Sequence, residues 1–384
     1  MDFDYSDEEN FAPNDIYQLY YHVNYTWPCL SFDVLPDNLG ASRSTFPHSA
    51  SFVAATQASD PKDNAIIVTH LSQMRCTKND DEEGVSQDQD HSNMKEKSFP
   101  YNSTTNRIKV YRGRPCITAT TDANKVISLW DVSNENSPLI CSTAVPGNSR
   151  IPEEGYGLCW SPTSPTLAGG FSDGTIWIWD CSSGALVPSS TIPTEHGSVE
   201  DLVFSPDGSP VLCSCGTDGT VMIWDRRASV ETRTLIKASN SDVNVVDWNP
   251  SLQYRIVSGA DDGVISVWDL RMLSDDESGL TMTSSLIQYH QEPITSVGWN
   301  PNDECEFAVC ADDNSLTIWD TSIEKGDDTE TDPEIPDQLL FIHHVISPKE
   351  LHYHPQVQKM IAVTGEDGLD VFIPDIEVSE ETTA

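Results

Sequence analysis

Four histidines near the C-terminal end are the residues whose type and spacing most suggest chemistry. They are His343, His344, His352 and His354. Such a density of imidazoles is typical of a metal site. When the internal repeats described below are aligned, however, Tyr353 matches Trp299 and His354 matches Asn300, so these histidines take ordinary positions in and after a strand. We therefore expect the protein to bind no metal ion and no other cofactor.

Motifs for catalysis are missing from the sequence. It contains no GxxxxGK[ST] or GxGxxG phosphate loop and no HExxH zinc motif. Paired carboxylates are frequent, but among 61 acidic residues this is unavoidable and favours a solvated acidic surface. We expect no catalytic residues, and hence a protein that is not an enzyme.

The charge of the chain restricts its partners. The 384 residues include 61 Asp and Glu against 21 Lys and Arg, which gives a formal net charge of −40. An anionic surface repels phosphate backbones and anionic lipids, so we expect no direct binding of nucleic acid or membranes. One basic cluster is expected to pair with neighbouring acids; it contains Arg107, Lys109, Arg112 and Arg114. The remaining attraction is for a basic protein.

Three sequence signals repeat in phase along the chain. Trp-Asp pairs occur at Trp130, Trp179, Trp224, Trp268 and Trp319. Aromatic-x-Pro triplets begin at Trp160, Phe204, Trp248, Trp299 and Tyr353. Turns begin at Asp173, Asp218, Asp262, Asp313 and Asp367. Short strands with tight turns at a period of roughly 40–45 residues are typical of a β-propeller blade.

These units resemble WD repeats. In that family a histidine, a serine or threonine, the turn aspartate and the tryptophan form a structural hydrogen-bond network. The matching residues of the fourth unit are His196, Ser214, Asp218 and Trp224. A degenerate first blade around residues 46–70 and a last one with Ile373-Pro374 in place of Trp-Asp raise the count to seven. The sequence thus predicts an all-β, seven-bladed WD-repeat propeller.

The segments outside the blades complete the predicted domain plan. An acidic disordered N-terminus (1–13) precedes a short helix at 14–23, for which Asn14 is the N-cap and Ile16, Leu19, Tyr20 and Val23 recur at helical spacing. The propeller spans 24–374, with a strand at 27–35 closing the last blade and acidic inserts at 79–90 and 324–337. An acidic tail covers 375–384.

The entry segment and the acidic loop resemble those of the histone-binding WD-repeat proteins. The closer resemblance is to the glutamate-rich WD-repeat proteins, carried by segments 20–40, 52–57, 154–162, 196–206, 241–250, 293–301 and 339–355. That resemblance implies a chaperone of a large-subunit ribosomal protein, the third, in the nucleus and specifically the nucleolus, with shuttling to the cytoplasm left open. The long Glu-rich insert usual in this branch is short here, because 79–90 holds only six acids.

In that family, helix and loop form one groove for a basic helix. The implied partner contacts are Ile16, Leu19, Tyr20, Asp327, Asp328, Glu330, Asp332, Glu334 and Asp337. Two alternatives remain open: a histone-binding chromatin chaperone, and a substrate receptor of a cullin-type ubiquitin ligase. The second rests on the Trp-Asp-x-Arg boxes that end in Arg227 and Arg271. We expect a monomer whose ten cysteines are reduced thiols.

Overall fold

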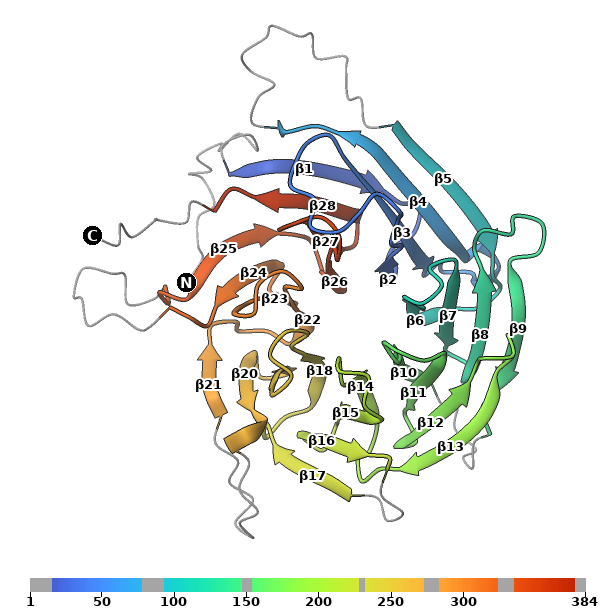
Figure 1. Cartoon of the computed structure of the whole chain (residues 1–384), viewed down its shortest axis with the longest axis vertical. Helices are drawn as coiled ribbons and strands as arrows, with labels where there is room; N and C mark the ends of the chain where they lie inside the picture. The colour runs from blue at the N-terminus through green and yellow to red at the C-terminus, as the bar shows by residue number, and fades with distance from the viewer. Residues whose placement is uncertain are drawn as a thin grey trace, which may run out of the picture.

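Seven antiparallel sheets, each of four strands, form a ring around a central channel (Figure 1). The computed structural model describes residues 16–77, 93–146, 154–227, 232–272, 283–323 and 335–376. The all-β class and the seven-bladed propeller predicted from the repeats are confirmed. In every blade the innermost strand lies at the channel and the outermost strand at the rim (Figure 1).

The first four blades follow the chain in order. Blade 1 contains β2 (Cys29–Val34), β3 (His48–Thr56), β4 (Ala65–Met74) and β5 (Asn93–Pro100). Blade 2 contains β6 (Thr105–Val110), β7 (Ile117–Asp122), β8 (Val126–Asp131) and β9 (Leu139–Ala144). Blade 3 contains β10 (Gly155–Trp160), β11 (Thr166–Phe171), β12 (Thr175–Asp180) and β13 (Val187–Pro193). Blade 4 contains β14 (Val199–Phe204), β15 (Val211–Gly216), β16 (Thr220–Asp225) and β17 (Thr232–Lys237).

The last three blades complete the ring. Blade 5 contains β18 (Val243–Trp248), β19 (Arg255–Ala260), β20 (Val264–Asp269) and β21 (Thr283–Gln288). Blade 6 contains β22 (Ile294–Trp299), β23 (Glu306–Ala311), β24 (Ser315–Asp320) and β25 (Leu339–His344). Blade 7 contains β26 (Glu350–Tyr353), β27 (Ile361–Thr364), β28 (Gly368–Pro374) and β1 (Tyr17–Asn24). Two single-turn 3-10 helices, η2 (Pro61–Asp63) and η4 (Leu270–Met272), lie in connections, and none of the described helices could span a membrane.

The hydrogen-bond network that characterises the repeat is present in blade 4. One ring nitrogen of His196 lies 2.8 Å from Asp218 Oδ1 and the other 3.0 Å from Ser214 Oγ. The indole N–H of Trp224 donates to the same Ser214 Oγ at 2.9 Å. The turn needs Gly219, whose φ is +73° and whose missing Cβ would lie 2.5 Å from Ser239 O. The histidine, serine and tryptophan are buried, so the network holds the blade together from within.

The N-terminal helix predicted for residues 14–23 is wrong, because this segment forms strand β1. The strand pairs antiparallel with β28, from Tyr17 opposite Pro374 to Asn24 opposite Gly368. The apolar residues of this segment fit the alternating spacing of a strand as well as they fit helical spacing, and tyrosine and valine favour strands. Pairing within blade 7 decides in favour of a strand, because the other three strands of that blade, β26 to β28, come from the C-terminal part of the chain. The outer edge of β28 would otherwise be left unpaired.

The predicted closing strand at 27–35 also has a different role. Residues 29–34 form β2, the innermost strand of blade 1, which pairs with β3. Closure comes instead from β1, one element earlier in the chain, so the ring is sealed by pairing its N-terminal strand with its C-terminal one. The acidic segments 1–13 and 79–90, most of the 324–337 loop and most of the 375–384 tail lie outside the described residues.

Candidate partner-binding site

Strand β1 and strand β25, which follows the acidic loop in the chain, lie together at the outer rim of blades 6 and 7. Strand β1 contains two of the predicted contacts, Leu19 and Tyr20, and Ile16 directly precedes it; β1 and β25 are the outer strands of blades 7 and 6 (Figure 1). The Tyr17 hydroxyl is 2.6 Å from His343 Nδ1, and the Tyr17 and Phe341 rings are 5.5 Å apart, edge to face. The contact is therefore made through strands, although the helix that was expected to make it does not exist.

Only some of the predicted contacts can reach a partner. Ile16 is 37% exposed and Tyr20 half-buried, and Ile335, at the end of the acidic loop, is 53% exposed. Leu19 is completely buried against blade 1, so its prediction as a partner contact is wrong. A strand alternates sides, and this alternation turns Leu19 inward where a helix would have placed it beside Ile16. We call Ile16, Tyr20, Ile335 and Asp337 the rim surface.

A carboxylate beneath the rim surface anchors β1. Asp370 of β28 accepts from the Tyr20 hydroxyl at 3.2 Å and lies 2.7 Å from His22 Nδ1 and 3.3 Å from His343 Nε2. Burial alone would raise the pKa of Asp370, but the hydrogen bonds from His343 and His22 outweigh it and hold the pKa below its usual value. This network joins blades 6 and 7 to the closing strand and fixes the rim.

The acidic half of the predicted groove falls largely outside what the structure describes. Of its six acids, Asp337 is half-buried just before β25. The other five lie outside the described residues; they are Asp327, Asp328, Glu330, Asp332 and Glu334. That these acids act together with β1 stays a prediction. The structure describes only the C-terminal end of the loop, where it enters β25.

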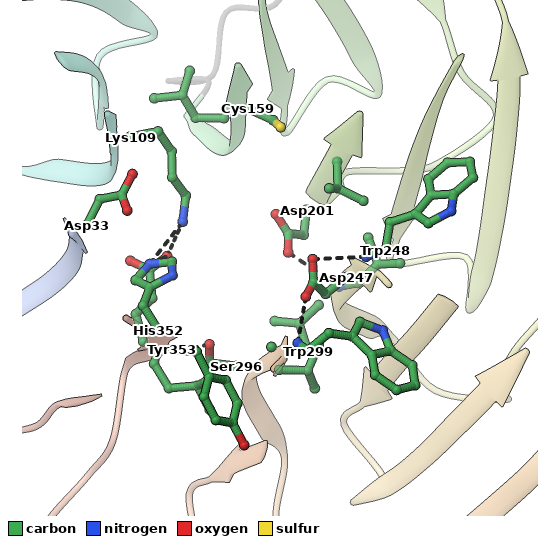
Figure 2. Close-up of a pocket in the computed structure, with 18 of the residues that line it drawn as sticks. Asp33, Lys109, Cys159, Asp201, Asp247, Trp248, Ser296, Trp299, His352 and Tyr353 are labelled. Carbon is green, nitrogen blue, oxygen red and sulfur yellow. Dashed lines mark hydrogen bonds and ion pairs between the residues drawn. The ribbon is translucent and has the colours of Figure 1, made fainter. Parts of the chain in front are cut away.

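A second concentration of charge lines the central channel. Side chains from all seven inner strands line one cavity there, which has a volume of about 390 Å³ (Figure 2); the labelled ones that point into it are Asp33, Lys109, Cys159, Asp201, Asp247, Ser296 and His352. The rings of Trp248 and Trp299 point away from it, between the blades (Figure 2). Because the inner strands run in register, these polar groups form two rings one pleat apart.

Several of these side chains tie one blade to the next. Each of four inner-strand carboxylates accepts a backbone N–H from the neighbouring inner strand. The pairs are Asp33 with Val110 (2.7 Å), Asp201 with Val246 (3.3 Å), Asp247 with Trp299 (2.8 Å) and Glu350 with Phe32 (3.0 Å). The last pair crosses the seam between blades 7 and 1, so the ring is closed at the channel as well as at the rim.

The basic cluster is paired with acids, as predicted. Glu350 Oε1 lies 2.5 Å from Lys109 Nζ and 3.3 Å from Arg107, while Arg112 contacts Asp33 at 2.6 Å and Arg114 contacts Asp131 at 3.6 Å. Burial would raise the pKa of Glu350, but Lys109, His352 and Arg107 hold it well below its usual value.

Asp247 lies on the opposite wall of the channel. Burial raises its pKa to about 7, although two backbone N–H groups donate to its carboxylate.

Sequence reasoning missed the acids of the channel. The sequence contained a usable signal. Asp33 and Asp247 occupy the fifth position of mostly apolar inner strands. Asp201 and Glu350 occupy the position two residues earlier when the inner strands are aligned. A charge at an aligned position of a buried strand indicates a paired structural group.

Three of the four candidate metal histidines have separate partners, and the fourth, His344, is exposed. His343 belongs to the Asp370 network, and His352 Nε2 is 3.0 Å from Phe32 O and 3.3 Å from Glu350. His354 Nδ1 accepts the backbone N–H groups of Gln356 and Val357, and burial lowers the pKa of this histidine to about 3. Within the described ranges, no group of three or more His, Cys, Asp or Glu has the geometry to hold a metal ion.

The two Trp-Asp-x-Arg boxes place their arginines on the surface of adjacent blades. Arg227 contacts Asp225 at 2.5 Å and Arg271 contacts Asp269 at 2.6 Å, and both arginine side chains are more than half exposed. The hydrogen bond from Arg227 lowers the pKa of Asp225 to about 2. Each box therefore presents a guanidinium already oriented by its own aspartate.

Comparisons with known proteins agree with this architecture. The family model of the histone-binding protein RBBP4, which also describes a component of the CAF1 complex, matches residues 7–75, and the model "Nucleolar protein 10-like, N-terminal domain" matches residues 143–340. Ribosome assembly protein rrb1 of Schizosaccharomyces pombe is 33% identical, over 96% of this chain and 82% of its own. The glutamate-rich WD repeat-containing protein 1 of Dictyostelium discoideum is 34% identical over 52% of this chain and 46% of its own.

The chain belongs to the glutamate-rich WD-repeat protein family. A further relative, Protein HEAT STRESS TOLERANT DWD 1 of Arabidopsis thaliana, is 32% identical over 92% of this chain and 85% of its own. The histone-binding model covers β1 to β4, which include the closing strand and hence part of the rim surface. The resemblance inferred from the entry segment is thus confirmed at the level of the family.

Proposed function

We propose that this WD-repeat protein is a non-catalytic scaffold that chaperones a basic protein during ribosome assembly. The proposed client is a large-subunit ribosomal protein, the third, and the proposed location is the nucleolus. The observation that carries the proposal is the net charge of −40 on a rigid disc. A polyanion of this size competes with nucleic acid for a basic surface and keeps the free client soluble.

The rim surface is the proposed docking place. Ile16, just before β1, and Ile335, near the C-terminal end of the acidic loop, are exposed apolar residues. An amphipathic basic helix would bury its apolar face on them and pair its charges with the loop acids. The similarity to a protein named for ribosome assembly, over 96% of this chain, supports the choice of client.

Purification of the tagged protein at low salt, followed by mass spectrometry of its partners, tests the proposal. We expect one large-subunit ribosomal protein in stoichiometric amount and its loss at moderate salt, because exposed charge pairs are screened beyond roughly 8–10 Å. Recovery of no basic protein would contradict the proposed function.

Histones are the second candidate client. The specific observation in their favour is the histone-binding family model that matches residues 7–75. The same purification separates the two, since core histones would replace the ribosomal protein among the stoichiometric partners.

A ligase receptor is the remaining alternative, favoured by the exposed arginines of adjacent blades, Arg227 and Arg271. Co-purification of a ubiquitin-ligase adaptor, lost when both arginines are changed to alanine, would support it. Retention of the basic client by the same double variant would show that the two surfaces are independent.

A further inference from the structure

Blade 2 lacks the imidazole that blades 4 and 6 contain. In blade 4, His196 bridges Ser214 and Asp218, and in blade 6, His290 lies 2.9 Å from Thr317 Oγ1 and 2.7 Å from Asp313. The aligned position of blade 2 is Asn102, which precedes Trp130 by as many residues as His196 precedes Trp224. The Asn102 side chain is exposed.

A smaller network replaces the missing one. The Trp130 indole N–H donates to Thr120 Oγ1 at 3.0 Å, as its counterpart in blade 4 donates to serine. The Asp122 carboxylate takes over as acceptor, with the hydroxyl of Ser103 at 2.7 Å and that of Tyr101 at 3.1 Å. The Tyr101 hydroxyl also bonds Thr120, the counterpart of Ser214, so the tyrosine takes over contacts that the imidazole makes in blade 4.

A cavity of about 690 Å³ lies beside this network, in the cleft between blades 1 and 2. Its walls include the rings of Phe99, Tyr101 and Trp130, with Tyr101 and Trp130 edge to face at 5.0 Å. Its polar lining includes Asp122, Asn124 and the exposed Glu135. The hydrogen bonds that the Asp122 carboxylate accepts come from hydroxyls and from the backbone N–H groups of Asn124 and Val126, which are neutral donors.

This lining matches one kind of side chain. Aromatic rings attract a planar cation, and carboxylates and side-chain amides accept its N–H groups. Lysine carries a compact, strongly hydrated charge and fits a cleft between rings less well.

We propose that the cleft between blades 1 and 2 binds an arginine side chain of a partner protein. The site is separate from the rim surface on blades 6 and 7 and does not depend on the client proposed above. Glu135, which lies 2.6 Å from Lys97 of blade 1, would exchange that exposed lysine for the incoming guanidinium.

The test is titration of the whole protein with N-acetyl-arginine amide, followed through the indole N–H signals of its ten tryptophans by NMR. We expect the Trp130 signal to shift with arginine amide and much less with N-acetyl-leucine amide. Equal shifts with both probes would show a merely apolar cleft, and an unmoved Trp130 signal would show no site. Either result overturns the proposal.

Two pairs of variants locate the site. Asn102→His places a larger side chain in the wall of the cleft and should weaken arginine-amide binding roughly tenfold, whereas Asn240→His at the aligned position of blade 5 should not. Glu135→Gln should weaken binding roughly threefold without disturbing the core, with Glu292→Gln on blade 6 as the matched control. Unchanged binding in both cleft variants would contradict the assignment, and the second pair keeps the test valid if Asn102→His fails to fold.

Discussion

The central channel and the rim of blades 6 and 7 both concentrate charge, but they use it differently. In the channel, Glu350 is nearly completely buried and holds Lys109, Arg107 and a backbone N–H of the next blade. At the rim, Ile16 is exposed just before β1, and Ile335 is exposed near the end of a loop with seven acids. Charges that are paired inside a fold hold its parts together, whereas an excess of one sign at the surface attracts a partner.

The largest expected effect concerns the channel. Glu350→Gln removes the buried carboxylate that the half-buried Lys109 and Arg107 share, and the free energy of unfolding should fall by about 3–5 kcal/mol. Urea unfolding measures it, with Glu366→Gln, an exposed acid on the same blade, as the control. A loss as small as that of the control would mean that the channel charges are not structural.

The second prediction separates two residues of the same segment. Leu19 is completely buried, so Leu19→Ala should lower the free energy of unfolding by about 2–5 kcal/mol. Ile16 is exposed, and Ile16→Ala should change it by less than about 0.5 kcal/mol while weakening client binding. If both variants lost stability equally, the rim surface would be part of the fold rather than a docking place.

The third prediction concerns pH. Because burial raises the pKa of Asp247 to about 7, the folded state keeps a proton that the unfolded chain releases near pH 4. The stabilisation that this proton brings is complete below the unfolded pKa and is lost as the pH rises through about 7. Relative to the wild type, Asp247→Asn should therefore gain stability as the pH rises from about 5 to about 8 in urea unfolding. A difference that does not vary with pH would contradict the assignment.

The smallest expected effect is at the two exposed boxes. Arg227→Ala and Arg271→Ala each remove a surface ion pair, so the melting temperature should stay nearly unchanged, with less than about 1 kcal/mol lost. Calorimetry of the double variant checks this. A large loss would show that these arginines support blades 4 and 5 and are not presented for a partner.

The sequence predicted the repeated parts well because each blade carries its own signals. Trp224, Asp218 and His196 recur in phase with their counterparts, and short-range turn chemistry is enough to place their strands. It failed at the closing strand, because residues 16–23 satisfy helical and strand spacing alike. The decision rests on an unpaired edge of β28, hundreds of residues away in the chain.

The candidate site, like the fold, was predicted from the sequence only in part. The juxtaposition of the N-terminal segment with the strand after the acidic loop was predictable by resemblance, and Tyr17 beside Phe341 shows that these strands meet. The error at Leu19 followed from the wrong secondary structure. The blade-to-blade hydrogen bonds of Asp33, Asp201 and Asp247 could be predicted only after the inner strands were aligned. A single aspartate in a mostly apolar run of sequence has no evident partner.

The most direct test of the account is the affinity for the client when the acidic loop is neutralised. Asp327, Asp328, Glu330, Asp332, Glu334 and Asp337 would be changed to Asn or Gln. The control neutralises the six acids of the other insert, Asp80, Asp81, Glu82, Glu83, Asp88 and Asp90. Binding of the purified third large-subunit ribosomal protein would be measured by calorimetry at low and moderate salt.

We expect the loop variant to lose roughly tenfold or more in affinity for the client, together with most of the salt dependence of binding. Its melting temperature should stay the same or rise, because repulsion among the loop acids is relieved. The control should lose much less. Full affinity in the loop variant would contradict the claim that the rim of blades 6 and 7 binds the client.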